Sequence, residues 1–227
     1  MPRAFTQLHF TESVKAAQAA YGSRTSNLAL EMSSVSHDQL GETEKAFIEE
    51  RDSFYQATVN ENGWPYVQHR GGAAGFLQVL DAHTIAFADF SGNRQYISVG
   101  NLRSNNKIAL ILMDYRNRRR LKLWGRVRIV HETEDSALIA RLEVPIYRAR
   151  IERAFVIEVE AFDWNCPKHI TPRYTEHEVS ELIDSLQQEI AQLKQERDQL
   201  LALSTATSLH RDPDTDLLSN PHLPDFT

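Results

Sequence analysis

The sequence predicts a mainly β protein with flanking helices, in which six or seven short strands form an antiparallel barrel followed by a long C-terminal helix. Three observations predict this fold. Short β-prone segments follow one another between residues 53 and 165 with few helices between them, as is typical of antiparallel barrels. The dipeptide Asn62-Gly63 separates two such segments and is a strong hairpin signal. Apolar residues recur every seven positions from Val179 onward, which indicates a coiled-coil helix.

The composition excludes several classes of protein. The chain has 227 residues, 41% of them hydrophobic, which suffices for one substantial domain with appendages. Its net charge of −6 argues against a general nucleic-acid binder. A single cysteine, Cys166, allows no intrachain disulfide and indicates a reducing compartment. The N-terminus does not resemble a signal peptide, and no run approaches the roughly 18 apolar residues of a membrane span, so we expect a cytoplasmic protein with no membrane partner.

The N-terminal region is expected to hold a helix and a loop. Thr11 is suited to cap a helix that runs to Tyr21 and stops at Gly22. The polar, mixed stretch 23–36 predicts a loop, and a second helix is predicted over 43–50. The expected divisions of the whole chain are 1–42 for the N-terminal helix and loop, 43–174 for the barrel, 175–203 for the C-terminal helix and 204–227 for a flexible tail.

The barrel region alternates strands and turns. Within segment 107–114 the residues 108–113 are apolar without interruption, which predicts a strand buried on both faces. Segment 121–130 alternates apolar and polar residues, which predicts a strand with one buried face. The full set of predicted strands is 54–59, 64–69, 76–80, 84–89, 107–114, 121–130 and 154–162, and the helices between them are 95–104 and 134–142.

The C-terminal helix opens with a capping box, Thr175 to Glu178. Leucine or valine then falls at the d positions of a heptad and isoleucine at the a positions, until Arg197 takes the next a position. This choice of residues favours a parallel two-stranded coiled coil between two copies. The alternative is a helix packed on its own barrel. The seam residues are Val179, Ile183, Leu186, Ile190, Leu193 and Leu200.

Two arginine-bearing turns form the candidate binding site. Arg70 precedes Gly71-Gly72, where backbone amides can approach a ligand without a Cβ in the way. Arg94, between Asn93 and Gln95, opens the helix that is predicted to run to residue 104. A helix N-terminus combined with guanidinium groups suits a phosphate dianion. The two turns would converge if the sheet curls into a barrel. Alternatively, each arginine is simply a surface residue.

The order of these features resembles the pyridoxamine 5′-phosphate oxidase-like, FMN-binding split-barrel family over about residues 43–165. Segment 87–95, FADFSGNRQ, resembles the family's strand followed by Ser-Arg-Lys, with Arg94 matching the phosphate-binding arginine and Gln95 in the place of the lysine. Segment 120–127, RLKLWGRV, is similar to its Gln-Val-x-x-x-Gly segment, with Arg120 in the place of the glutamine. Segment 65–70 resembles its Pro-x-x-Arg region, and 100–112 its helix and following strand.

The resemblance implies an α+β fold built on an antiparallel split β-barrel, and a homodimer with FMN in two clefts, each lined by both chains. Arg120, Lys122 and the Trp164 segment would approach from the partner subunit. His169 is the only candidate for a proton donor. No catalytic residue is otherwise assigned. The cofactor-binding residues that the resemblance implies are His69, Arg70, Gly71, Gly72, Gln78, Phe87, Ala88, Asp89, Ser91, Gly92, Asn93, Arg94, Gln95, Arg120, Lys122 and Trp164.

The implied function is an FMN-dependent oxidoreductase acting on an unidentified small substrate. The oxidase's Arg-x-His substrate motif is absent, and Gln78 stands where its strand-ending lysine is expected, so pyridoxamine phosphate is not the expected substrate. Two alternatives are a flavin-binding electron carrier or redox sensor without turnover, and a dimerisation module without flavin. Absorbance in the flavin bands would separate the last from the others.

Other residues have two interpretations each. The basic run 116–120 is either a phosphate or nucleic-acid patch or the solvated tip of a hairpin, with Arg120 turned into the cleft. Cys166 is either a reactive thiol or a packing residue. Trp124 and Trp164 either stack on a flavin or belong to the core. The spacing of His69, His83, His131 and His169 predicts no metal site.

Overall fold

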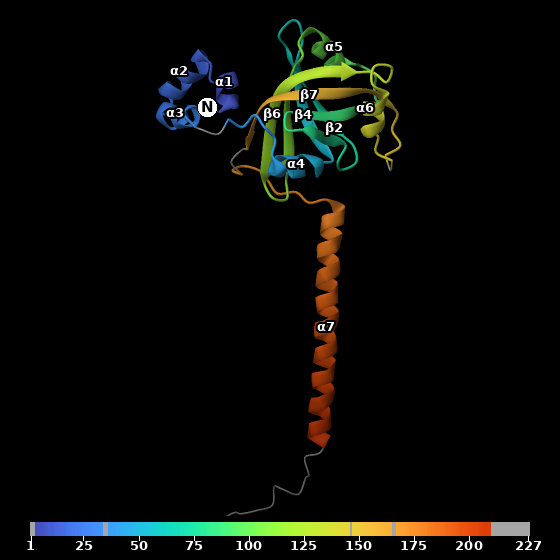
Figure 1. The fold of residues 1–227 in the computed structure, drawn as a ribbon. Helices are drawn as coiled ribbons and strands as arrows, with labels where there is room; N and C mark the ends of the chain where they lie inside the picture. Colours follow the sequence, from blue (N-terminus) through green and yellow to red (C-terminus); the bar gives the residue numbers. More distant parts are fainter. Residues whose placement is uncertain (1–2, 34–35, 146, 165–166, 210–227) are drawn as a thin grey trace, which may run out of the picture. The chain divides into compact units, whose positions relative to one another are not determined.

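The computed structural model describes residues 3–33, 36–145, 147–164 and 167–209. It divides into two units, residues 1–173 and 174–227, which we treat separately. In the first unit, seven strands form one antiparallel sheet in the order β2-β1-β5-β6-β7-β4-β3 (Figure 1). The strands are β1 (Ser53–Val59), β2 (Pro65–Gly71), β3 (Leu77–Asp81), β4 (Thr84–Phe90), β5 (Lys107–Asp114), β6 (Arg119–Val130) and β7 (Ile151–Trp164). The helices are α1 (Ala4–His9), α2 (Glu12–Ala20), α3 (Arg24–Glu31), α4 (Glu42–Glu49), α5 (Ile97–Ser104), α6 (Ser136–Arg141) and, in the second unit, α7 (Glu176–Leu209).

The β1–β2 hairpin forms where Asn62-Gly63 predicts it. Gly63 has φ +82°, in the left-handed region that glycine tolerates without a steric penalty. The Asn60 side-chain oxygen accepts hydrogen bonds from the backbone N–H groups of Asn62 (3.0 Å) and Trp64 (2.9 Å). These bonds fix the turn, and the turn fixes the register in which Gln56 pairs with Gln68.

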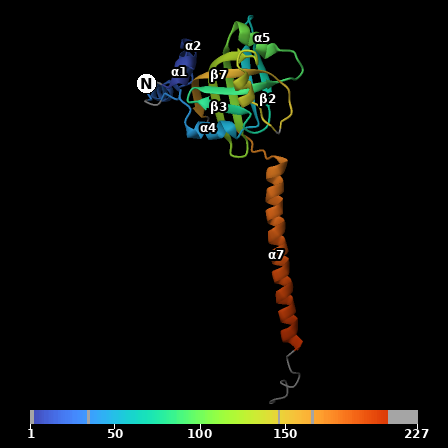
Figure 2. The same cartoon turned by 45° about the vertical axis from the view of Figure 1, so that its right-hand side comes forward.

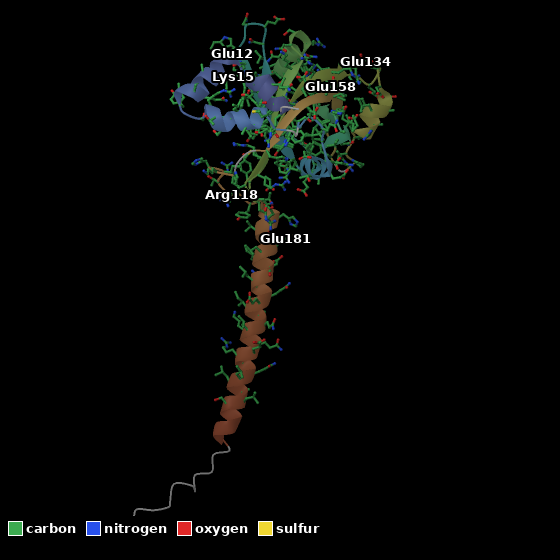
Figure 3. All side chains as sticks on the ribbon, turned by 60° about the vertical axis from the view of Figure 1, so that its left-hand side comes forward. Glu12, Lys15, Arg118, Glu134, Glu158 and Glu181 are labelled. Carbon is green, nitrogen blue, oxygen red and sulfur yellow. The ribbon has the colours of Figure 1, made fainter. Side chains whose placement is uncertain are left out.

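The β5–β6 hairpin contains the basic run. Arg118, labelled in Figure 3, is an exposed residue of the turn between the two strands and has φ +53°. Beyond it, Leu121 and Leu123 are buried, whereas Lys122 between them is not, so the predicted alternation of this strand is confirmed. The basic run therefore forms the tip of a hairpin.

The sheet curls around its core without closing. Strands β2 and β3 are the two ends of the hydrogen-bonded order, so no backbone ladder joins them. Aromatic side chains fill the interior between them: the rings of Phe54 and Phe76 stack at 5.6 Å, and Phe87 meets Phe54 and Phe155 edge-on at 5.1 Å. The fold is therefore the predicted antiparallel split barrel with seven strands, and its open seam is the split.

Helices cover the ends and one flank of the barrel. Helix α4 lies at one end and buries Phe47 and Ile48, and α5 lies at the other end and buries Val99 and Leu102 (Figures 1 and 2). Helix α6 packs on β7, beside a separate small cluster of buried alanines from β4 and β7. The position of α5 matters for function, because its N-terminus lies next to the split.

The prediction of a loop over 23–36 is wrong, because Arg24–Glu31 forms α3. The Arg24 guanidinium forms an ion pair with Glu31 at 2.5 Å and donates a hydrogen bond to the Gln18 side chain of α2 at 3.0 Å. These contacts stabilise a helix that local composition does not favour. The N-terminal region holds a third helix, α1, which was not expected; Phe5 on it stacks on Trp124 of the barrel at 6.3 Å.

Two helix limits also differ from expectation. Helix α5 begins at Ile97 rather than at Gln95, because Tyr96 has a left-handed backbone that a helix cannot include. Helix α7 continues to Leu209, past the expected end at residue 203. The remainder of the predicted tail, residues 210–227, and Cys166 lie outside the described residues. Among the described helices, none is both long and apolar enough to cross a membrane.

Gly125 provides a test of the β6–β7 pairing. A Cβ at this position would lie 2.2 Å from the backbone oxygen of Glu158, where β7 carries a bulge opposite β6. We expect Gly125→Ala to lower the free energy of unfolding by about 1–3 kcal/mol, as overpacking in cores does. Chemical denaturation followed by tryptophan fluorescence measures this change.

The matched control is Gly100→Ala in α5, where the added methyl meets no atom within 4 Å. Because alanine is favoured over glycine in helices, this variant is expected to gain up to about 1 kcal/mol. Equal destabilisation by the two substitutions would contradict the close approach at Gly125.

Candidate functional site

The main cavity lies where the chain leaves β4 and faces β2 across the split. It encloses about 290 Å³. Strand β2 contributes alternate side chains, the segment after β4 contributes a polar loop, and α5 contributes its first turn. The lining residues are Tyr66, Gln68, Arg70, Asp89, Phe90, Gly92, Asn93, Arg94, Gln95, Tyr96, Ile97, Ser98, Val99 and Glu152. Six of these were predicted from the sequence: Arg70, Asp89, Gly92, Asn93, Arg94 and Gln95.

The loop after β4 has an uncommon backbone. Arg94 has φ +59° and Tyr96 has φ +53°, both in the left-handed region, which costs about 1–2 kcal/mol for a residue with a side chain. Side-chain hydrogen bonds stabilise the conformation: Arg94 Nε donates to the Tyr96 hydroxyl at 3.2 Å, and that hydroxyl donates to Glu152 at 3.2 Å. The loop therefore presents Arg94 in one defined arrangement beside the first turn of α5.

Helix α5 directs an uncapped N-terminus at the cavity. Tyr96 at its N-cap position makes no side-chain capping hydrogen bond, and the next three residues, Ile97 to Val99, all line the cavity. The first N–H groups of a helix have no partner within the helix and carry the positive end of its dipole. In addition, the Ser98 hydroxyl donates to the Gln68 side chain at 2.8 Å, which ties the helix to β2. This end of α5 is suited to an anion.

A buried ion cluster forms one wall of the cavity. Asp89 at the end of β4 accepts a hydrogen bond from Arg70 Nη1 at 2.6 Å, and its second oxygen lies 3.3 Å from Arg153 Nε. Burial raises the pKa of Asp89, and the charges of the two arginines oppose that shift. The cluster joins three strands, β2, β4 and β7, across the open side of the barrel.

Glu152 connects this cluster to the loop. It forms an ion pair with Arg153 and accepts a hydrogen bond from Tyr96. Burial opposes its ionisation, but hydrogen bonds from Ser91 and Tyr96 and the charge of Arg153 together hold its pKa below its ordinary value. Glu152 is therefore anionic at neutral pH, and it neutralises part of the positive charge at the cavity.

Two guanidinium groups retain capacity to bind a ligand. Arg94 is exposed, and its one hydrogen bond within the described part of the chain uses Nε, toward Tyr96. Arg70 is largely buried, and its Nε has no hydrogen-bond partner among the described residues. A buried donor without a partner costs about 1–3 kcal/mol, so the arginine as a whole, which lines the cavity, keeps unused hydrogen-bonding capacity. Together with α5, these donors can hold a polyanionic or hydroxyl-rich ligand.

A second, smaller cavity of about 150 Å³ adjoins the first, since Arg70 and Phe90 line both. It lies between the end of β2 and the middle of β4. Its other lining residues are His69, Gly71, Phe76, Phe87 and Ala88. Four of them (His69, Gly71, Phe87 and Ala88) were predicted, so the two cavities together hold most of the predicted positions.

The remaining predicted residues lie outside both cavities and have other contacts. Gly72 fits closely over the ring of Phe76, since a Cβ there would lie 2.7 Å from it. The Gln78 amide donates to the Arg141 carbonyl at 3.1 Å, and Ser91 hydrogen-bonds Glu152. His169 is exposed and has φ +64°. Their roles toward a cofactor stay predictions.

Arg120, Lys122 and Trp164 lie elsewhere on the barrel. Lys122 forms an ion pair with Asp163 at 3.2 Å, and Trp164 Nε1 donates to Glu44 at 2.8 Å. Trp164 also packs edge-on against Phe47 at 4.7 Å, which makes it part of the α4 end of the core within one chain. Within one chain, these three residues do not meet the Arg94 loop.

Several lining residues were not found from the sequence. Gln68 and Tyr66 alternate with Arg70 along β2, so the period of two was a usable signal once Arg70 was assigned to the site. Arg153 lies 64 positions after Asp89 and meets it only because β4 pairs with β7, a pairing that no local pattern predicts. In the described part of the chain, no three His, Cys, Asp or Glu side chains are grouped to hold a metal ion.

The fold and the site define a class: an antiparallel split-barrel protein with a polar, anion-suited cavity at its split. The family model described as pyridoxamine 5′-phosphate oxidase matches residues 40–164, more than half of the chain. The chain therefore belongs to the pyridoxamine 5′-phosphate oxidase family. The match spans all seven strands together with α4, α5 and α6.

Solved structures resemble part of the chain. HupZ of Group A Streptococcus is 16% identical, with 60% of this chain and 99% of that chain covered at a TM-score of 0.42. An FMN-binding protein from Syntrophomonas wolfei is 16% identical, with coverages of 54% and 83% and a TM-score of 0.41. A pyridoxinephosphate oxidase family protein from Clostridium acetobutylicum, related to general stress protein 26, is 21% identical, with coverages of 56% and 86% and a TM-score of 0.40. No curated protein matches the chain.

The ion cluster predicts a large effect of one uncharged substitution. Asp89→Asn would leave the buried Arg70 and Arg153 guanidinium groups without their shared carboxylate. We expect the free energy of unfolding to fall by about 3–5 kcal/mol, as when one partner of a buried ion pair is removed. Urea denaturation of the purified chain measures the loss.

Asp163→Asn is the matched control, because its partner Lys122 is more exposed than either arginine. A more solvated pair contributes about 0–1 kcal/mol. If the two variants lose the same stability, the Asp89 cluster does not hold the split together.

Proposed function

We propose that this chain is an FMN-dependent oxidoreductase that acts on a small organic substrate. The single observation that carries the proposal is the main cavity, in which Arg94 and the uncapped N-terminus of α5 line one polar space. A phosphate monoester is the ligand that such an arrangement suits best. Membership of the pyridoxamine 5′-phosphate oxidase family supports the choice of FMN among phosphate-bearing ligands.

The residues present fit the parts of FMN. Arg94, Asn93 and Gln95 would hold the phosphate with the first turn of α5. Gln68, which Ser98 already engages, and the Arg70 guanidinium line the same cavity and would be polar partners for the ribityl hydroxyls. His69, Phe87 and Ala88 line the adjoining cavity, where the flavin ring would begin. Bound in this way, FMN would supply the electron and hydride transfer that no side chain can supply.

The chain's own residues would position the ligand and control charge. Asp89 holds Arg70 in place from β4, and Glu152 holds the Arg94 loop through Tyr96. Because Asp89 and Glu152 balance Arg70 and Arg153, Arg94 carries the net positive charge of the site. A dianion would therefore be attracted to the loop end of the cavity rather than to its interior.

The site is small for the whole cofactor within one chain, which supports a homodimer. The main cavity, at about 290 Å³, lies at the lower limit for ligand sites of about 300–1,000 Å³. The outer face of β1 and β2 exposes Tyr55, Val59 and Val67, with 63% of Val67 accessible. Lys122 lies on this same outer face, since Tyr55 pairs with Ile111 and Ile111 with Lys122. A second copy covering this face would bring Arg120 and Lys122 toward the other chain's cavity.

The chain's single cysteine fits a reducing compartment, and we include a cytoplasmic location in the proposal. The substrate would enter beside the flavin ring, and its identity is open. His169 stays a candidate proton donor on the strength of the family resemblance alone.

The cofactor site is tested by flavin binding. Arg94→Ala removes a charged bidentate donor, which is worth about 1.5–3 kcal/mol, so the Kd for FMN should rise about 10- to 100-fold. Quenching of FMN fluorescence on titration measures the change. Arg103→Ala on the same helix is the control, because Arg103 is exposed and does not line the cavity. Unchanged affinity in the Arg94 variant would overturn the site.

Turnover is tested with the FMN-loaded wild-type protein. Anaerobic addition of NADH or NADPH is expected to bleach the flavin absorbance faster than that of free FMN at the same concentration. Readmitted oxygen or a candidate acceptor should restore it. Stable absorbance with both nicotinamides would instead support the flavin-carrier alternative.

A further inference from the structure

The second unit exposes an apolar stripe along a long helix. Helix α7 has 34 residues, and its start is fixed by a capping box in which Glu178 accepts from the backbone N–H of Thr175 at 2.8 Å. The helix then presents six apolar side chains that are each between 42% and 67% exposed. They are Val179, Ile183, Leu186, Ile190, Leu193 and Leu200. A contiguous apolar surface of this kind marks an interaction site.

The stripe has the spacing of a coiled-coil seam. Ile183 and Ile190 fall at a positions, and the valine and leucines fall at d positions. Two charged residues of the first turns lie away from the seam: Glu181 (Figure 3) takes an f position and Asp184 a b position. The helix runs without a break through Arg197 to Leu209, so Arg197 does not end the helix, although the apolar side chains of the seam end at Leu200.

We propose that a second copy of this chain covers the seam, as a parallel, in-register, two-stranded coiled coil formed by α7. Isoleucine at a with leucine at d is the combination that favours two parallel strands. In such a pair the same residue of each copy meets at every layer, so the seam of one chain is complementary to itself. This inference goes beyond the proposed function and does not depend on flavin.

The charges beside the seam select the parallel orientation. Glu189 takes a g position and Lys194 the following e position. In a parallel pair, g of one helix faces e of the next heptad on the other, so Glu189 would pair with the second copy's Lys194, twice by symmetry. An antiparallel pair sets g against g, and the charged g residues are both glutamates, Glu189 and Glu196. Like charges along that flank disfavour it.

Arg197 selects the register. It takes an a position between Leu193 and Leu200, and in the free helix it is ion-paired with its neighbour Asp198 at 2.7 Å. In register, the two Arg197 side chains share one layer, each beside a Glu196 at g of the other helix. A slip of one heptad would set one arginine against the apolar Ile190 and the other against Ser204, and neither would keep its shared layer. A single polar a residue fixes register and strand number in this way, at some loss of stability.

Disulfide trapping in the full-length chain tests the arrangement. In a Cys166→Ser background, Val179→Cys and Leu200→Cys each place a thiol at a d layer, near opposite ends of the seam and about 31 Å apart along the helix. A parallel, in-register pair brings each thiol to its own counterpart at disulfide distance. We expect both variants to form covalent dimers under mild oxidation, seen on non-reducing gels.

The control is Gln195→Cys at an f position, which should remain monomeric on the same gels. Trapping of Val179→Cys alone would overturn the proposal. Contact between the two barrels could by itself bring the first turns of the two α7 helices together, without a coiled coil along their length. Trapping of neither variant would overturn it in favour of a helix packed on its own barrel. Equal trapping of the Gln195 variant would also overturn the proposal, because disulfide formation would then not depend on the position of the thiol in the heptad.

A second set of variants tests the seam itself. Adding Leu193→Asp to the Leu200→Cys chain puts a charge in an apolar layer, and we expect at least a tenfold lower yield of covalent dimer. Adding Gln195→Asp, the same change two residues away and outside the seam, should leave the yield unchanged. Loss of dimer in both, or in neither, would overturn the assignment of the seam.

Discussion

The carboxylate of Asp89 is the contact on which the arrangement of the barrel's open side depends. Backbone hydrogen bonds join all six pairs of neighbouring strands in the sheet, but its two end strands, β2 and β3, have no ladder between them. Arg70 from β2 crosses that gap to Asp89 on β4, and Arg153 from β7 meets the same carboxylate. Together with the Phe54–Phe76 stack, this cluster sets the distance between β2 and the loop after β4. The main cavity exists because of that distance.

The same cluster changes which residue can capture an anion. Sequence reasoning treats Arg70 and Arg94 as two equivalent guanidinium groups that grip one phosphate. In the structure Arg70 already shares Asp89 with Arg153, so most of its charge is satisfied inside the protein. Arg94 is exposed, and the uncapped first turn of α5 lies beside it. The positive potential therefore comes from the loop and the helix end, whereas Arg70 lines the cavity with a guanidinium that Asp89 largely neutralises.

Features that depend on neighbours in the sequence were predictable, and features that depend on distant strands were not. The hairpin at Asn62-Gly63, the alternation of β6 and the capping box of α7 follow from local chemistry. The left-handed backbone of Arg94 and Tyr96 does not, because only the hydrogen bonds to Tyr96 and Glu152 stabilise it. The same applies to α3, where a contact with α2 stabilises a polar helix. That the turns carrying Arg70 and Arg94 lie close together was predicted only because the sheet was expected to curl into a barrel.

Symmetry constrains how the two proposed contacts of this chain combine. A parallel, in-register coiled coil has a two-fold axis along its length, and a barrel pair that shares its clefts has a two-fold axis of its own. One closed dimer satisfies both contacts only if the axes coincide. Otherwise each chain would use its barrel face for one neighbour and α7 for another, and the chains would assemble into larger particles. With coincident axes, α7 tethers the barrels and raises their effective concentration into the range where a weak interface forms completely. The β1–β2 face exposes only a few apolar side chains, among them Tyr55, Val59 and Val67, and is the kind of interface that needs this help.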